Sequence, residues 1–252
     1  MSTFDLDVVR RFADLATDAL AEHRQEINAL NVFPVPDGDT GTNLYLTIAA
    51  ARDGLTSSAA ELGGDEGQDK GRDEGRDEDA AGAMAAFARG ALLGARGNSG
   101  AILAEMIGAL VRRLATAPPE EPRAAGFAAG LRAASVAAVA AVGEPLEGTM
   151  LTVLCAAAEA AERSVSIDPA VHTRDVIGVA AAAAREALEH TPEQLDVLRV
   201  AGVVDAGGRG VCVILDAFDA AVSGRLPAAP SRPARSAEPV APSRPPADAA
   251  TS

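Results

Sequence analysis

The sequence has very few aromatic side chains. It contains no tryptophan and one tyrosine among 252 residues, and aromatic residues make up 3% of the chain. The apolar content, 48% of all residues, therefore comes from aliphatic side chains, and much of it is alanine. Alanine has the highest helix propensity, and its small side chain lets helices pack closely. This composition predicts an all-α fold.

Cysteine and long hydrophobic runs are also scarce. Cys155 and Cys212 are the two cysteines, and both lie in apolar, helix-like runs. We interpret them as buried thiols, with a disulfide or a reactive site as the alternatives. No run of about 18 uncharged apolar residues occurs, so no transmembrane span is predicted. The first residues lack the basic-then-apolar pattern of a signal peptide, and we expect a cytoplasmic protein.

Positive charge is in short supply. The formal net charge is −14, which argues against a nucleic-acid partner because such a partner requires a basic surface. Nine acidic and three basic residues fall between Glu61 and Asp79. We expect this low-complexity insert, about 61–80, to be a mobile loop without chemistry. Residues 225–252, rich in Pro, Ala and Ser, are expected to be a disordered tail or a linker, which leaves 1–224 as one helical domain.

Apolar residues recur with helical spacing along the rest of the chain, and glycine- and proline-rich loops separate the segments. The predicted helices cover about 5–30, 42–55, 81–93, 101–114, 124–142, 150–163, 173–190 and 211–222. Val211–Leu215 is β-branched enough for a strand, but we assign it to the last helix because it lies within a longer helical pattern. Eight helices without a convincing strand predict a helical bundle or barrel.

Two aspartates one residue apart mark the sharpest candidate site. Asp37 and Asp39 flank a glycine in the segment DGDTGTN, so both carboxylates can turn onto one hard cation. Mg²⁺ prefers oxygen ligands and normally keeps waters or phosphate oxygens as the remainder. A calcium EF-hand loop is excluded because Gly41 and Ile48 stand where it needs an Asp or Asn and a Glu. A polar turn that caps the next helix is the alternative.

Four loops that contain glycine together with hydroxyl or acidic side chains open directly into apolar helices. Their sequences are DGDTGTN (37–43), RGNSG (96–100), EGTM (147–150) and DAGGRG (205–210). The amino terminus of a helix presents free N–H groups and a partial positive charge, and glycine lets an anion approach the backbone closely. Gathered at one end of a bundle, these loops would form a phosphate cradle beside a metal. Simple N-capping by Ser99 or Thr149 is the alternative.

The common phosphate-binding and kinase motifs are missing. Lys70 is the only lysine and lies in the acidic insert, so no GxxxxGK[ST] loop exists, and neither HRD nor DFG occurs. We interpret His23, His172 and His190 as surface or packing residues. Catalysis at such a site would depend on positioning and charge neutralisation rather than on a covalent residue.

Four segments in this order and spacing resemble a known family. They are NVFPVPDGDTGTN (31–43), ARGNSGAILAE (95–105), EGTMLTV (147–153) and VVDAGGRG (203–210). Together they resemble the nucleotide-binding (L-type, DhaL-like) domain of the dihydroxyacetone kinase superfamily, and most closely the amino-terminal domain of bacterial fatty acid kinase. The resemblance covers about 8–222 apart from the insert. It implies an eight-helix barrel whose loops at one end hold ATP or ADP with magnesium.

The same resemblance implies roles for residues of this sequence. Asp37 and Asp39 would be the catalytic residues and metal ligands, and Asn31 would replace a third acidic metal ligand of the dihydroxyacetone kinase branch. The implied nucleotide-binding residues are Thr40, Gly41, Thr42, Asn43, Asn98, Ser99, Gly100, Gly148, Thr149, Met150, Asp205, Ala206, Gly207 and Gly208. Among them, Thr149 and Met150 would border the base.

The implied activity is Mg-dependent phosphoryl transfer from ATP to the carboxylate of a fatty acid held by a separate acyl-binding carrier protein. A nucleotide subunit of a dihydroxyacetone-type kinase is the second hypothesis, and Asn31 argues against it. A non-catalytic, nucleotide-binding regulatory protein is the third. Fatty acid kinase continues into further domains where this sequence has its Pro-rich stretch, so we expect activity to require a partner protein. The resemblance also leaves a homodimer open.

Overall fold

The computed structural model describes residues 5–62 and 72–224, and every regular element in these ranges is a helix. The long helices are α1 (Leu6–Leu30), α2 (Thr40–Leu62), α3 (Arg72–Gly94), α4 (Gly97–Ala115), α5 (Arg123–Ala140), α6 (Met150–Ile167), α7 (Thr173–Glu189) and α10 (Ala206–Ser223). The predicted all-α fold is confirmed, including the helical assignment of Val211–Leu215. Within the described ranges, no helix is long and apolar enough to cross a membrane.

Two features of the helix pattern differ from the prediction. The short helices α8 (Thr191–Gln194) and α9 (Asp196–Ala201) were not predicted, because segments of this length show no periodicity. Part of the acidic insert is helical, since α2 runs on to Leu62 and α3 begins at Arg72. Arg, Glu and Ala have high helix propensities even where no apolar stripe is present. The remaining residues of the insert, 63–71, and the predicted tail, 225–252, lie outside the described residues.

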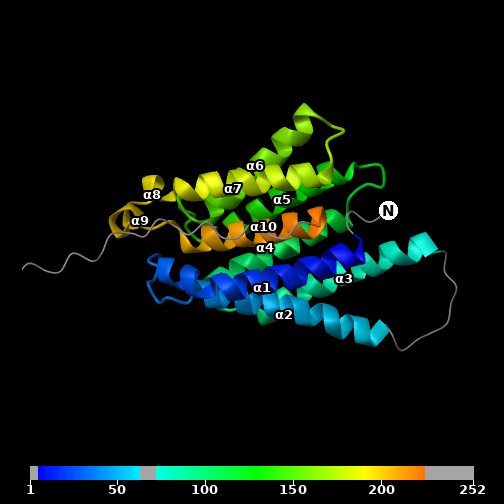
Figure 1. Cartoon of the computed structure of the whole chain (residues 1–252), viewed down its shortest axis with the longest axis horizontal. Helices are drawn as coiled ribbons and strands as arrows, with labels where there is room; N and C mark the ends of the chain where they lie inside the picture. Colours follow the sequence, from blue (N-terminus) through cyan, green and yellow to red (C-terminus); the bar gives the residue numbers. More distant parts are fainter. Residues whose placement is uncertain (1–4, 63–71, 225–252) are drawn as a thin grey trace, which may run out of the picture.

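The eight long helices form a closed ring, which confirms the predicted eight-helix barrel. Each helix from α1 to α7 packs on the next one, and α10 packs on both α7 and α1. The first and last helices of the domain are therefore neighbours (Figure 1). At this closing seam, Nη1 of Arg11 donates a hydrogen bond to the carbonyl oxygen of Ala221 at 3.4 Å.

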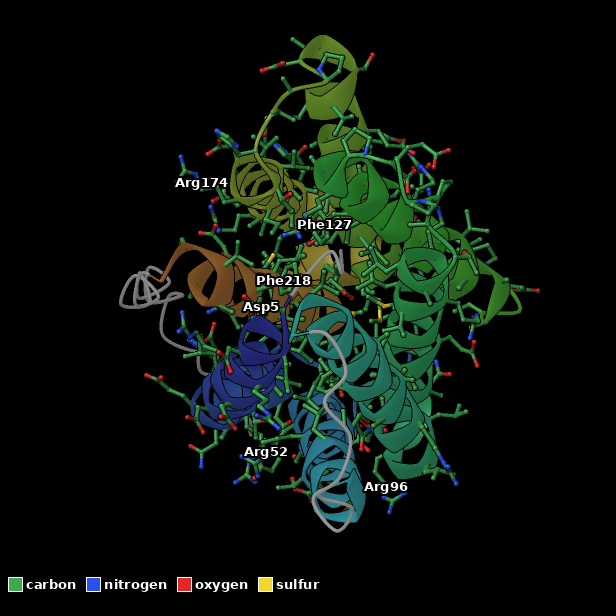
Figure 2. All side chains as sticks on the ribbon, turned by 90° about the vertical axis from the view of Figure 1, so that its right-hand side faces the viewer. Asp5, Arg52, Arg96, Phe127, Arg174 and Phe218 are labelled. Atoms are coloured by element: carbon green, nitrogen blue, oxygen red, sulfur yellow. The ribbon has the colours of Figure 1, made fainter. Side chains whose placement is uncertain are left out.

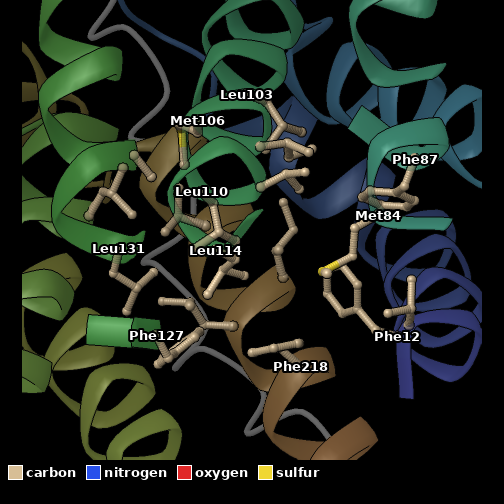
Figure 3. Close-up of a pocket in the computed structure, with 18 of the residues that line it drawn as sticks. Phe12, Met84, Phe87, Leu103, Met106, Leu110, Leu114, Phe127, Leu131 and Phe218 are labelled. Atoms are coloured by element: carbon tan, nitrogen blue, oxygen red, sulfur yellow. The ribbon is translucent and has the colours of Figure 1, made fainter. Parts of the chain in front are cut away.

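Apolar side chains fill the ring. In Figure 2, Phe127 of α5 and Phe218 of α10 lie inside it, whereas Arg52 and Arg174 lie on its outer surface. The rings of Phe127 and Phe218 stack with centroids 5.4 Å apart, and Phe12 of α1 meets Phe218 edge-on at 5.1 Å. An apolar cavity of about 110 Å³ lies beside these rings (Figure 3). Cavities lined only by apolar atoms stay dry.

The cysteines are both free thiols. Cys212 of α10 is fully buried, and burial raises the pKa of its thiol to about 12. Cys155 of α6 is only partly buried, and its sulfur lies 3.8 Å from Nη1 of Arg132. The predicted burial therefore holds fully for Cys212 and in part for Cys155.

Helices α2 and α3 approach each other backbone to backbone. A Cβ atom at Gly90 would lie 2.5 Å from the carbonyl oxygen of Ala50, and one at Gly54 would lie 2.7 Å from that of Ala86. Both distances are too short for a side chain. Glycine at these two positions therefore sets the spacing of the pair.

Candidate functional site

The amino termini of α2, α4, α6 and α10 lie at the same end of the ring, at the left in Figure 1. All four predicted glycine-containing loops are therefore on one face of the molecule. A cavity of about 150 Å³ opens among them. Seven of the predicted site residues line it: Thr40, Asn98, Ser99, Thr149, Met150, Asp205 and Gly207. The four loops thus lie together at one end of the ring, but the helix ends that follow them differ in how they are capped.

The amino terminus of α2 is capped by Asn31, the C-cap residue of α1. Oδ1 of Asn31 accepts hydrogen bonds from the backbone N–H groups of Asp39 and Thr40, both at 3.3 Å, and from the hydroxyl of Thr40 at 2.9 Å. Its Nδ2 donates to the carbonyl oxygen of Val35 at 2.9 Å. Asn31 is buried, and every polar atom of its amide is engaged within the loop. This geometry favours a structural role for Asn31 over the predicted role of metal ligand.

Asn28, one turn earlier on α1, holds the next residues of α2. Its Oδ1 accepts from the backbone N–H of Thr42 at 3.1 Å, and its Nδ2 donates to the Thr42 hydroxyl at 3.0 Å. Gly41 lies so close to α1 that a Cβ atom there would collide with the carbonyl oxygen of Arg24. Gly41 and Thr42 therefore face α1 and do not line the cavity, although the resemblance implied that both bind the nucleotide.

The amino termini of α6 and α10 are also capped from within the chain. Oγ1 of Thr149 accepts from the backbone N–H of Leu151 at 3.4 Å, and Oδ2 of Asp205 accepts from that of Gly208 at 2.7 Å. Burial raises the pKa of Asp205 to about 6, against the opposing effect of hydrogen bonds from the backbone N–H groups of Gly208, Met150 and Gly207. An anionic side chain already occupies the position that a phosphate would take at α10.

Helix α4 is the exception among the four. Its N-cap residue is Arg96, and in the described part of the chain no side chain caps this helix. Gly97 has a φ of 57°, and a Cβ atom there would collide with the side-chain amide of Asn43. Asn43 therefore packs against the first turn of α4. Asn98 and Ser99, in that first turn, line the cavity. An uncapped helix amino terminus of this kind is the arrangement that binds phosphate.

The two aspartates of the DGD segment directly precede Thr40, which lines the same cavity as Asn98 and Ser99. Gly38 between them has a φ of 67°, which glycine adopts at little cost, and Asp37 is exposed while Asp39 is half-buried. No group of three or more His, Cys, Asp or Glu side chains gathers into a metal site in the described ranges. The pair supplies two hard oxygen ligands, which fits Mg²⁺ if water and phosphate complete its octahedron.

A network of charged side chains ties α10 to α1. Nε of Arg209 donates to Oε1 of Glu26 at 2.8 Å, and Nδ1 of His23 lies 2.7 Å from Oε2 of Glu26. Burial acts to raise the pKa of Glu26, but the hydrogen bonds from Arg209 and His23 outweigh burial and hold this pKa below its ordinary value. The network joins the first turn of α10 to the helix whose end carries Asn28 and Asn31.

Sequence reasoning missed part of the cavity wall, most of it apolar. Its additional lining residues are Phe33, Pro34, Ile102, Val142, Glu144, Leu146 and Leu151. Four of them lie within the motif segments, but the three from the loop after α5 had no sequence signal. The remaining predicted residues do not line the cavity: Asn31, Asp37, Asp39, Gly41, Thr42, Asn43, Gly100, Gly148, Ala206 and Gly208.

Fold and site together define a helical domain with a phosphate- and metal-compatible face at one end of a closed ring. A family model described as "DAK2 domain" matches residues 34–220. The chain therefore belongs to the DAK2 domain family, which confirms its resemblance to the nucleotide-binding domain of the dihydroxyacetone kinase superfamily.

Curated proteins and a solved structure are also similar to this chain. Protein YloV of Bacillus subtilis is 37% identical over 221 residues, and an uncharacterized protein of Staphylococcus saprophyticus is 37% identical over 215 residues. These matches cover 85% and 84% of this chain but only 36% and 35% of the relatives, so the chain spans about a third of their length. The dihydroxyacetone kinase of C. freundii shares the fold, with a TM-score of 0.56 over 87% of this chain and 35% of that one at 18% identity.

Proposed function

We propose that the chain binds Mg-ATP at this face and acts in the cytoplasm as a phosphotransferase domain. Asp37 and Asp39 would hold magnesium, and the first turn of α4, with Asn98 and Ser99, would hold phosphate. The observation that carries the proposal is the uncapped amino terminus of α4, on a face where the three other helix ends are capped and where Thr40, directly after the aspartate pair, lines the same cavity. Membership of a kinase-related family supports the same assignment.

The acceptor that fits best is a fatty acid carboxylate presented by a separate acyl-binding protein. Within the part of the chain that the structure describes, Glu144 and Asp205 are the titratable residues that line the cavity, and Asp205 is engaged by backbone N–H groups. A carboxylate acceptor is already ionised at neutral pH and needs no general base, whereas a hydroxyl acceptor must lose a proton. The acyl substrate therefore needs no base from this cavity, whereas dihydroxyacetone would need one, for which Glu144 is the candidate.

The proposed step is a single displacement. A carboxylate oxygen of the acceptor attacks the γ-phosphorus, the bond from that phosphorus to the oxygen bridging to the β-phosphate breaks, and acyl phosphate and ADP result. Magnesium, when bound, neutralises charge on the phosphates. The α4 amino terminus would orient the phosphates, and Asp37 and Asp39 would fix the metal, so the protein contributes alignment and electrostatic stabilisation.

Calorimetric titration of ATP with and without Mg²⁺ tests the binding part of the proposal. Asp37→Asn and Asp39→Asn should each weaken Mg-ATP binding by about tenfold or more, because even indirect support of a metal is worth that much. Asp53→Asn is the matched control, since it removes the same charge from an exposed position on α2. Unchanged affinity of both site variants for Mg-ATP, with helicity intact by circular dichroism, would refute the assignment of Asp37 and Asp39 as metal ligands.

Turnover then distinguishes the acceptors. ATP consumption is expected only when an acyl-loaded binding protein is added to the chain. Consumption with a dihydroxyacetone-loaded partner instead would favour the second hypothesis. Mg-ATP binding without turnover on either partner would make the chain a non-catalytic, nucleotide-binding protein.

A further inference from the structure

The residues that follow the aspartate pair present one face of α2 to the start of α4. Thr40 and Asn43 are three positions apart and Asn43 and Thr47 are four apart, so helical geometry places them on the same side of α2. Thr40 lines the cavity, and the side-chain amide of Asn43 fills the space that a Cβ atom of Gly97 would need. Thr47, one turn further along α2, contacts Arg96 at the start of α4.

One hydroxyl, that of Thr47, joins these two helices. Its Oγ1 donates to the carbonyl oxygen of Asn43 at 2.7 Å and accepts from the backbone N–H of Arg96, the N-cap residue of α4, at 3.3 Å. Thr47 is 0% exposed, so water does not compete for either bond. A Cβ atom at Gly100 would collide with this Oγ1, so the hydroxyl lies directly against the first turn of α4.

This hydroxyl holds α4 without capping its first turn. It bonds to the N–H of the N-cap residue, whereas the N–H groups of Gly97, Asn98 and Ser99 receive no cap from a side chain in the described part of the chain. Those three groups belong to the turn to which we assign the phosphates. A side chain bonded to one of them would compete with phosphate. Thr47 therefore fixes where α4 begins and leaves its anion-binding groups available.

Two other buried threonines show how specific this arrangement is. Thr191 donates to the carbonyl oxygen of Leu188 at 2.7 Å and accepts from the N–H of Asp205, the N-cap residue of α10, at 3.1 Å. Thr17 donates to the carbonyl oxygen of Ala13 at 2.7 Å, and within the described ranges its hydroxyl makes no bond to a second helix. A buried threonine thus holds the start of α10 as well, whereas Thr17 makes the local bond alone.

We infer that Thr47 is a positioning residue, which holds the phosphate-binding end of α4 at a fixed distance from the metal-binding start of α2. Thr47 lies seven positions after Thr40, about 10 Å along a rigid helix. The aspartate pair and the start of α4 are therefore both tied to α2. This matters because metal and phosphate groups must meet one triphosphate at matching positions. The inference rests on the proposed function, since it requires phosphate at α4 and magnesium at Asp37 and Asp39.

The experiment compares serine with alanine at position 47, because these two residues differ only in the hydroxyl oxygen. Thr47→Ala should weaken Mg-ATP binding by about tenfold, since a group that orients a ligand-binding element is worth about that much, and Thr47→Ser should stay within about twofold of wild type. Mg-tripolyphosphate, which carries the phosphates without a nucleoside, should follow the same pattern. Calorimetric titration of both ligands into the full chain gives the affinities, and thermal unfolding shows whether each variant is folded.

Alanine at Thr17 and at Thr191 supplies the matched controls. Thr17→Ala removes a hydroxyl that is almost equally buried, at 3% exposure, and that makes the same local bond, so it measures what such a loss does to the whole domain. Both affinities should be unchanged in this variant. Thr191→Ala releases the start of α10 instead of α4, so its affinity for Mg-tripolyphosphate should be unchanged. A purely structural role for Thr47 predicts a change in melting temperature without a loss of affinity.

Four results would overturn the inference. Thr47→Ala could bind Mg-ATP as tightly as wild type, or Thr47→Ser could lose as much affinity as Thr47→Ala, which would assign the effect to the methyl group. Thr17→Ala could lose as much affinity as Thr47→Ala, or Thr47→Ala could lose Mg-ATP but keep Mg-tripolyphosphate, which would place the effect at the nucleoside. If Thr47→Ala does not fold, Thr47→Val, which lacks the hydroxyl but keeps the volume, is compared with Thr47→Ser. A wild-type chain that binds no Mg-ATP would refute the proposed function, and the inference with it.

Discussion

Asn31→Asp separates two roles for the residue that ends α1. The substitution keeps the size of the side chain and the acceptor oxygen that caps Asp39 and Thr40. It replaces Nδ2, which donates to the carbonyl oxygen of Val35 at 2.9 Å, with a second oxygen. Two acceptors would then face each other in a position that is 7% exposed. If Asn31 is structural, the variant should be destabilised; if it is a metal ligand, the added charge should strengthen the metal site.

The expected cost is about 2 kcal/mol, since a buried polar group without its partner costs about 1–3 kcal/mol. For a domain of this size, that corresponds to a fall in melting temperature of about 4–8 °C. Asn28→Asp is the matched control because it adds the same charge one turn away. There Nδ2 meets the Thr42 hydroxyl, which can turn and donate to a carboxylate, so the loss should be less than about half as large.

The assay is thermal and urea unfolding of both variants, first without and then with Mg²⁺ and ADP. A loss for Asn31→Asp that exceeds the loss for Asn28→Asp and persists with the ligands would support the structural role. The reasoning would be refuted by an Asn31→Asp protein as stable as wild type without ligands. Greater stabilisation by Mg²⁺ and ADP than wild type shows would restore the metal-ligand assignment.

Three further expectations concern stability. Gly90→Ala should lower the free energy of unfolding in urea by about 1–3 kcal/mol, because the added Cβ atom would meet a backbone carbonyl of α2. Gly82→Ala, where the added Cβ atom would have nothing within 4 Å, should stabilise its helix by about 0.5–1 kcal/mol. Equal effects of the two substitutions would refute the close packing of α2 and α3. The lowered pKa of Glu26 implies stability that is present above its ordinary pKa of 4.5 and lost as the pH falls through the pKa in the folded protein. Glu26→Gln and Arg209→Met should therefore each reduce the dependence of the free energy of unfolding on pH in the acid range. The raised pKa of Asp205 implies stability that is present below its ordinary pKa of 3.8 and lost as the pH rises through about 6. Asp205→Asn should therefore remove the fall in melting temperature over this pH range. A fall that persists in the variant would show that another group causes it.

The long helices could be predicted because each has an apolar face that repeats with helical spacing, and glycine and proline mark the breaks. Helices α8 and α9 could not, because four and six residues are too few to show a period. The helical start of α3 was missed for a different reason. Its charged residues carry helix propensity but no periodic apolar signal, so the segment has the composition of a solvated loop.

The candidate site was predictable in its location but less so in its chemistry. Four glycine-containing helix starts indicated one anion-binding face, yet sequence could not tell which starts are capped. Asn28 and Asn31 lie within or beside an ordinary helical pattern, and their bonds to α2 depend on how α1 ends against it. Asp205 stands directly before its helix, where it could equally cap the turn or face a ligand. Only the three-dimensional arrangement leaves α4 as the end without a cap.

The seam between α1 and α10 has a consequence for synthesis of the chain. Arg11 of α1 and Ala221 of α10, which meet there, are 210 positions apart, so α1 leaves the ribosome long before α10 can pack against it. At about 5–20 residues per second, that interval lasts on the order of ten to forty seconds. Throughout it, the buried face of α1, which includes Leu20 and Ile27, can pack on α2 and α3 but not on α10. A nascent chain of this topology therefore depends on α10 to end a long exposure of apolar surface to chaperones and proteases.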